Sequence, residues 1–83
     1  MVYNLLYTKS AVRDIKKLDR VARKKIKKRL EFLSLSPFKY SKKLTDPRLG
    51  TYRFRAGNYR VIFDIGGKNI IILRVGHRRE IYK

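Results

Sequence analysis

The sequence predicts an α+β fold with the element order β-α-α-β-β-β: a small, mainly antiparallel sheet with a helical hairpin packed on one face. Apolar residues recur at helical spacing between residues 9 and 35, and they alternate with polar residues after residue 51. Glycine-containing turn signals interrupt the second region, which is typical of antiparallel hairpins. The chain of 83 residues has room for one domain, and we expect residues 1–83 to form it.

The first part of the chain predicts one strand and one short helix. Residues 2–7 are largely apolar and β-forming, which predicts a strand. Thr8 and Ser10 are candidate N-caps for a helix over residues 9–18, because their hydroxyls can accept hydrogen bonds from free backbone N–H groups. The apolar face of this helix is formed by Ala11, Ile15 and Leu18.

A second helix follows almost at once. Asp19 is its candidate N-cap, and we expect the helix to end near residue 35, because Pro37 disfavours helical conformation in the preceding residue. One apolar stripe runs along it, formed by Ala22, Ile26, Leu30 and Leu33. The short link predicts an antiparallel helical hairpin that lays both apolar faces on the same side of the sheet.

The second half of the chain predicts three strands joined by tight turns. After an irregular connection over residues 36–50, residues 51–56 alternate between apolar and basic side chains. Gly57-Asn58 is a two-residue turn signal, and residues 59–65 resume the alternation. These two segments are therefore expected to pair as antiparallel neighbours.

A last strand is expected over residues 69–75, after a second turn at Gly66-Gly67. Its run from Ile70 to Leu73 does not alternate, which indicates a central strand covered on both faces. Because every residue of that run is apolar, the pattern does not fix the register. Residues 75–83 are expected to leave the sheet as a polar tail.

The charge of the chain points to an anionic partner. It carries 23 Lys and Arg against six Asp and Glu, a formal net charge of +17. Self-repulsion of this size destabilises a small fold, and a polyanion relieves it. Nucleic acid fits best, because phosphates release counterions when they bind Lys and Arg; an acidic protein and an anionic membrane surface come next. The basic run on the second helix is either a solvated face or a docking face.

The composition excludes several classes of protein. No apolar run approaches the roughly 18 residues that span a bilayer, which rules out a membrane protein. Among the possible anionic partners we expect nucleic acid and an acidic protein rather than a membrane. The N-terminal residues lack the basic segment of a signal peptide, so we expect a cytoplasmic protein. The absence of cysteine excludes disulfides and thiol chemistry. One His and six scattered carboxylates argue against a metal centre, and we expect neither metal nor cofactor.

An arginine cluster on the predicted hairpin is the most informative feature. The turn at Gly57-Asn58 sets Arg55 opposite Arg60 on one face, with Arg53 two positions along. Like charges directly opposite each other destabilise a sheet, so an anion that bridges the three guanidiniums is expected. Their planar forks match phosphate oxygens. The alternative is a solvated face on which the arginine stems lie over Ile62.

The predicted tail adds further polar groups to this end of the chain. His77, the only histidine, is followed by Arg78 and Arg79 and then by Tyr82. A histidine or tyrosine in a tail is, by itself, usually surface decoration or packing. Next to three converging arginines, the same residues are candidates for a reactive site.

Two segments carry a resemblance to a known family. Residues 50–63 resemble the "tyrosine, basic, apolar, basic, turn, tyrosine-arginine" hairpin of the RelE/ParE toxin superfamily, and residues 75–82 resemble its C-terminal ending. The resemblance covers nearly the whole chain and is strongest for the RelE-type mRNA interferases. It implies a toxin of a toxin–antitoxin pair that cleaves mRNA in the ribosomal A site. It also implies inhibition by a cognate antitoxin, which we expect to be acidic.

The resemblance implies a role for each candidate residue on the sheet. Arg53 and Arg55 stand where relatives often have lysine and are expected to bind substrate, and Arg79 is placed with them. As arginines they cannot donate protons as lysine can, because their pKa stays far above neutral. Arg60 matches the arginine that stabilises the scissile phosphate.

The tail supplies the remaining expected catalytic residues. Arg78 matches an arginine assigned to phosphate and leaving-group chemistry, and Tyr82 matches a tyrosine proposed as general base. Neighbouring arginines are expected to lower the pKa of that phenol from its ordinary value of about 10. The general acid is either His77, by its intrinsic pKa, or Arg78, by the family's precedent.

The expected reaction needs no metal, since the 2′-OH of RNA can attack the adjacent phosphate and leave a 2′,3′-cyclic phosphate and a 5′-OH. Two other functions remain open at this point. One is a ParE-like, non-catalytic inhibitor of a topoisomerase such as gyrase. The other is a non-catalytic basic module that binds RNA.

Overall fold

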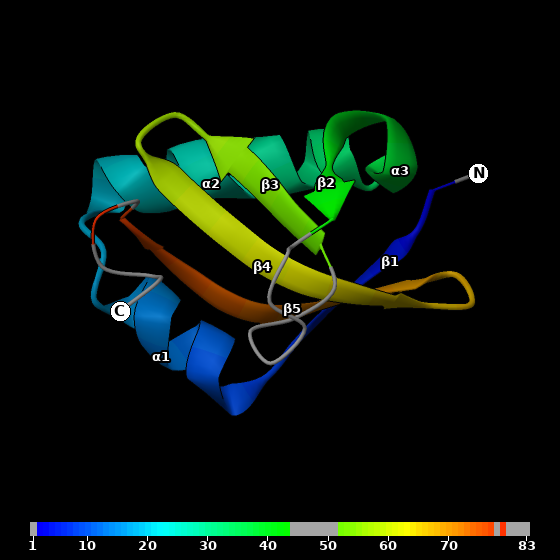
Figure 1. The fold of residues 1–83 in the computed structure, drawn as a ribbon. Coiled ribbons are helices and arrows are strands. Elements are labelled where there is room, and N and C mark those ends of the chain that lie inside the picture. The colour runs from blue at the N-terminus through cyan, green and yellow to red at the C-terminus, as the bar shows by residue number, and fades with distance from the viewer. Residues whose placement is uncertain (1, 44–51, 78, 80–83) are drawn as a thin grey trace.

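The computed structural model describes residues 2–43, 52–77 and 79, and it shows a mixed α+β fold around a five-stranded sheet of order β1-β5-β4-β3-β2 (Figure 1). In chain order the elements are β1 (Asn4–Tyr7), α1 (Lys9–Lys16), α2 (Arg20–Leu33), α3 (Pro37–Tyr40), β2 (Lys42–Lys43), β3 (Tyr52–Ala56), β4 (Tyr59–Gly66) and β5 (Asn69–His77). The predicted fold class is confirmed. Only the β1–β5 pair is parallel among the described pairs.

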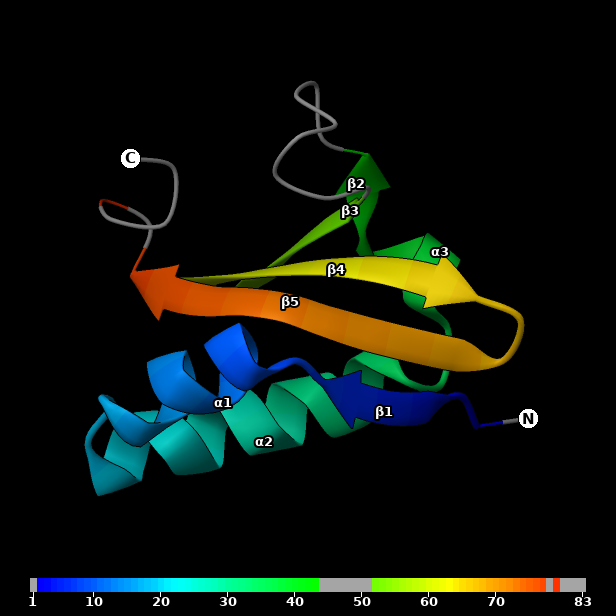
Figure 2. The same cartoon turned by 90° about the horizontal axis from the view of Figure 1, so that it is seen from below.

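Both long helices cover the same face of the sheet, as the sequence predicts (Figure 2). The apolar core lies between them and the strands, and it includes Ile26, Leu30 and Leu33 from α2 and Phe54, Phe63, Ile70 and Ile72 from the sheet. Burying each such side chain contributes roughly 1.5–3 kcal/mol. None of the helices that the structure describes is long and apolar enough to cross a membrane.

Of the three candidate N-caps, Thr8 and Asp19 cap the two helices, whereas Ser10 lies inside α1. The Thr8 hydroxyl accepts a hydrogen bond from the Ala11 N–H at 3.1 Å, and the Asp19 carboxylate accepts one from the Ala22 N–H at 2.7 Å. Each helix ends two residues earlier than expected. At the end of α1 the N–H groups of residues 17 and 18 bond three residues back rather than four, so the last turn has 3₁₀ geometry.

Two short elements occupy the segment that was expected to be irregular. Pro37 stands at the first position of α3, where its missing N–H costs nothing, and its ring is buried. Strand β2 follows, and its Lys42 pairs with Arg53 of β3. A four-residue helix and a two-residue strand are too short to show a periodic pattern of apolar residues. The two residues of β2 form a strand only because they pair with β3.

The first hairpin has the predicted register. Arg55 pairs with Arg60, and Arg53 pairs with Ile62. Gly57 has a φ of 64° and is followed by a residue with negative φ, which is the type II′ pattern.

The second turn lies one residue later than predicted. Gly66 still pairs with Asn69 at the end of the ladder, so Gly67 and Lys68 form the turn. Gly67 has a φ of 61°, so the flexible residue again takes the first central position.

Strand β5 is central, as expected, between β1 and β4. It continues to His77, beyond the expected end at residue 75. Ile70 and Ile72 are buried on the helix side, but Ile71 and Leu73 are only half-buried, so the second face is covered only in part rather than fully as expected. Leu73 is the extra residue of a bulge, because Phe63 pairs with Ile72 and Ile62 pairs with Arg74.

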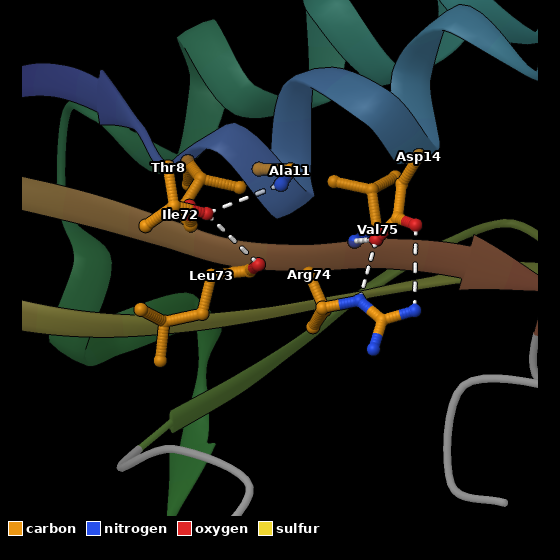
Figure 3. Close-up of polar contacts among 7 residues, drawn as sticks. All are labelled: Thr8, Ala11, Asp14, Ile72, Leu73, Arg74 and Val75. Carbon is orange, nitrogen blue, oxygen red and sulfur yellow. Dashed lines mark hydrogen bonds and ion pairs between the residues drawn. The ribbon is translucent and has the colours of Figure 1, made fainter.

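Strand β1 pairs with β5 only as far as Ile72, and side chains at the start of α1 contact the β5 edge beyond that point (Figure 3). The Thr8 hydroxyl lies 3.1 Å from the Leu73 carbonyl oxygen. Asp14 then accepts hydrogen bonds from the Val75 N–H at 3.0 Å and from Arg74 Nε at 2.7 Å. These side chains therefore satisfy the backbone of β5 that no strand pairs, and they fix its C-terminal half against α1.

Candidate functional site

A cationic hollow of about 250 Å³ lies on the sheet face that points away from the long helices. The residues that line it are Tyr40, Lys42, Arg53, Arg55 and Arg60. Four of these five carry a positive charge, and none is a carboxylate. We call it the arginine hollow. The structure thus brings together the three arginines that the hairpin pattern predicts.

The alternation of β3 and β4 explains why these arginines share one face. Phe54 and Ala56 are buried toward the helices, so Arg53 and Arg55 point to the other side. On β5 the partner of Arg60 is Gly76. Because glycine has no side chain, nothing from that position of β5 stands beside the Arg60 guanidinium.

Backbone carbonyls hold two of the guanidiniums near the turn. Arg55 Nε and Arg60 Nη1 lie 3.5 Å and 3.4 Å from the carbonyl oxygen of Gly57. These hydrogen bonds are long and therefore weak. Each guanidinium has five N–H donors, so both keep donors with which to bind an anion.

Ile62 lies on the same face as the arginines and is only 1% exposed. In the register it stands between Arg53 and Arg74. Its burial agrees with the alternative interpretation, in which aliphatic arginine stems shield this residue. The two interpretations are compatible, because a stem can pack on Ile62 while its head group lines the hollow.

Tyr40 and Lys42 complete the hollow, and no sequence pattern predicts them. Both lie in the segment that was expected to be irregular, Tyr40 at the end of α3 and Lys42 in β2. Lys42 reaches the site because it pairs with Arg53 across the sheet edge. A local sequence signal for this pairing is absent, since it depends on the tertiary approach of two strands.

His77 lies away from the arginine hollow. It pairs with Tyr59, on the face that Tyr59 packs against the core, and their rings meet edge to face with centroids 5.8 Å apart. It lines a separate hollow of about 310 Å³ together with Asp14 and Lys17, among others. The structure therefore does not bring His77 to the arginines, although the sequence suggested their convergence.

The remaining predicted residues follow β5. Arg79 is exposed, and its backbone N–H donates a hydrogen bond to His77 Nδ1 at 3.3 Å. Arg78 and Tyr82 lie outside the described residues, so their assigned roles stay predictions. The described residues contain no cluster of His, Asp and Glu that could hold a metal ion.

Comparison with known proteins gives consistent results. Residues 5–82 match the family described as "ParE toxin of type II toxin-antitoxin system, parDE". Toxin RelG of Mycobacterium tuberculosis is 34% identical over an alignment of 86 residues. The alignment covers 100% of this chain and 99% of the relative. Toxin RelE3 of Methanocaldococcus jannaschii is 37% identical over 82 residues, which cover 94% of this chain and 93% of the relative.

A solved structure agrees with the sequence matches. The toxin–antitoxin complex RelBE2 from Mycobacterium tuberculosis contains a chain that superposes with a TM-score of 0.83 at 32% sequence identity. The match covers 94% of this chain and 100% of that chain.

Proposed function

This chain belongs to the ParE toxin family of type II toxin–antitoxin systems, and we propose that it acts in the cytoplasm as a RelE-type toxin that cleaves mRNA in the ribosomal A site. The observation that carries the proposal is the arginine hollow, in which Arg53, Arg55 and Arg60 line one space. A phosphodiester backbone is an anion of the right shape for it, because each guanidinium can bind two phosphate oxygens.

The hollow stabilises bound RNA through the charges that destabilise the free protein. Arg55 and Arg60 are directly opposed across the hairpin and repel each other. A phosphate between them attracts both guanidiniums and offsets this repulsion. Arg60 contacts the scissile phosphate, while Arg53 and Arg55 hold the neighbouring phosphates. Arg79, exposed beyond β5, adds to the binding of substrate.

The proposed chemistry is attack by the RNA on its own backbone. The 2′-oxygen forms a bond to phosphorus as the bond to the 5′-oxygen breaks, which leaves a 2′,3′-cyclic phosphate and a 5′-OH. Tyr82 accepts the proton of the 2′-OH, and Arg60 and Arg78 stabilise the charge that develops on the phosphorane. Proton transfer of this kind contributes about 10²–10⁴-fold to the rate. The ribosome supplies the in-line orientation of the codon.

The proton donor to the 5′-oxygen is His77 or Arg78. Because His77 lies on the face opposite the hollow, it serves only a substrate that passes around the end of β5. His77→Ala separates the two assignments. A loss of at least about 10²-fold in cleavage rate assigns the proton to His77, and a rate near that of the wild type excludes His77 and leaves Arg78 as the remaining candidate.

We also infer that a cognate antitoxin binds this chain, since the similar RelBE2 structure is a toxin–antitoxin complex. A groove of about 370 Å³ between α1 and α2 has apolar walls that include Val12, Ile15 and Ile26. Lys16 and Lys27 line it as well. Such a groove fits an amphipathic antitoxin segment whose carboxylates face the lysines.

A second candidate function is inhibition of a topoisomerase without catalysis. The description of the matching family as ParE toxins favours it, as does the position of His77 away from the arginines. In this alternative the arginine hollow contacts the topoisomerase or its DNA rather than mRNA.

A purified translation reaction decides between these functions. We expect mRNA to be cut within the A-site codon, with a 5′-OH that polynucleotide kinase labels directly and a 2′,3′-cyclic phosphate on the upstream fragment. Intact mRNA, together with inhibition of gyrase supercoiling in a parallel assay, establishes the topoisomerase function instead. A 5′-phosphate at the cut contradicts attack by the 2′-OH.

A further inference from the structure

Exposed aromatic side chains gather around α3, next to the arginine hollow. Phe32 is 39% exposed, Phe38 is 59% exposed and Tyr40 is 36% exposed. The rings of Phe32 and Tyr40 have centroids 4.3 Å apart, and Phe38 meets Tyr52 edge to face at 5.8 Å. Tyr52 in turn stacks on the buried Phe63 at 5.6 Å. The contacts of Phe38, Tyr52 and Phe63 therefore continue from the core to the surface, while Phe32 and Tyr40 form a separate ring pair.

Tyr40 belongs to both the ring pair with Phe32 and the hollow. Its ring packs on Phe32, and it also lines the arginine hollow beside Lys42 and Arg53. The short helix α3 that carries Tyr40 is held in place by the buried Pro37 and by the Ser41 hydroxyl, which donates a hydrogen bond to the Pro37 carbonyl oxygen at 2.5 Å. A ring held in this way binds a ligand with little loss of side-chain entropy.

Proteins that bind unpaired RNA combine cationic groups for the phosphates with aromatic rings on which bases stack. We propose that Tyr40 is the stacking residue of this site and binds the nucleobase attached to a phosphate held in the arginine hollow. The inference rests on the proposed RNA-binding function and adds base recognition to it. Lys39, whose ammonium lies 5.7 Å from the centre of the Tyr40 ring, is exposed and can move aside for the base.

The test compares two ligands of equal charge. One is a short unpaired oligoribonucleotide, and the other is an abasic ribose-phosphate oligomer of the same length. Their dissociation constants for the full chain are measured by fluorescence anisotropy at one salt concentration. Tyr40→Ala is expected to weaken binding of the oligoribonucleotide by about 5- to 150-fold, the usual loss for one stacked base. The dissociation constant of the abasic ligand is expected to stay unchanged.

Further variants separate stacking from other roles of Tyr40. Tyr40→Phe keeps the ring and is expected to bind both ligands as the wild type does. Tyr40→Leu keeps apolar packing on Phe32 and is expected to weaken oligoribonucleotide binding as Tyr40→Ala does. Val21→Ala, which shortens an exposed apolar side chain on α2, serves as the control and is expected to change neither constant.

Several results overturn the inference. These are an equal loss for both ligands in Tyr40→Ala, a loss in Tyr40→Phe as large as in Tyr40→Ala, or no loss in Tyr40→Leu while circular dichroism shows a folded protein. Arg55→Ala tests the proposed function separately, because it is expected to weaken binding of both ligands. If Arg55→Ala changes neither constant, the phosphate site itself is refuted, whatever Tyr40 does.

Discussion

At the scale of single residues, the opposed Arg55 and Arg60 are costly for the fold. They pair directly across the hairpin and share the Gly57 carbonyl as a weak acceptor. We expect Arg55→Thr to raise the free energy of unfolding by about 0.2–1 kcal/mol, because it removes a like-charge pair and introduces a β-forming residue. Urea denaturation measures the change. An unchanged or lower stability contradicts this account of the pair.

A second prediction at this scale concerns pH. Burial and the nearby Glu31 carboxylate raise the pKa of the Tyr7 phenol above its ordinary value of 10.0. The folded state therefore binds this proton more tightly than the unfolded state does. Its contribution to stability is complete below about pH 10 and is lost as the pH rises through the raised pKa.

Tyr7→Phe removes this titration. We expect the variant to lose less stability than the wild type between about pH 8 and about pH 11, as measured by urea denaturation at both values. Parallel losses in the two proteins show that Tyr7 does not contribute to the alkaline sensitivity.

At the scale of elements, the contact between α1 and β5 holds the C-terminal half of β5 in place. The Asp14 side chain is 11% exposed and accepts hydrogen bonds from the Val75 N–H and from Arg74. The Arg74 side chain is 52% exposed. The ion pair therefore adds little, whereas the bond to the buried backbone of Val75 matters more.

Two variants separate these contributions. Asp14→Ala is expected to lower the free energy of unfolding by about 1–3 kcal/mol, because it leaves the Val75 N–H without its acceptor. Arg74→Ala is expected to lower it by no more than about 1 kcal/mol. Equal losses in the two variants show instead that the ion pair is the main contribution of Asp14.

The elements that the sequence predicts are those set by neighbouring residues, and the elements that it does not predict are those set by tertiary packing. The caps at Thr8 and Asp19 and the Gly57 turn are set by neighbouring residues, so local patterns predict them and the arginine register that follows. The position of His77 depends on the bulge at Leu73, which shifts the pairing by one residue and moves His77 to the face of Tyr59. The run from Ile70 to Leu73 is apolar throughout, so its pattern does not predict where a bulge lies. Tyr40 and Lys42 were missed for a related reason, since tertiary packing creates α3 and β2.

At the scale of the whole molecule, net charge dominates the behaviour of the free protein. A charge of +17 on 83 residues means that unlike partners are scarce and that like charges repel over the whole surface. Salt screens this repulsion, with a Debye length of about 10 Å at 0.1 M.

We therefore expect the melting temperature of the free chain to rise as sodium chloride is added, while its affinity for RNA falls steeply. Circular dichroism and anisotropy titrations over the same salt series measure the two trends. A melting temperature that falls with salt refutes self-repulsion as a limit on stability.

The central claim is that the arginine hollow holds the phosphodiester that is cut. Its most direct test is the single-turnover rate of mRNA cleavage on ribosomes with a defined A-site codon, for the wild type, Arg60→Ala and Arg13→Ala. Arg13 is exposed on α1 and supplies the matched loss of one charge on the helix side. The account predicts that Arg60→Ala slows cleavage at least about 10²-fold while Arg13→Ala cuts at the wild-type rate. Cleavage by folded Arg60→Ala at the wild-type rate, or no cleavage by the wild type, contradicts it.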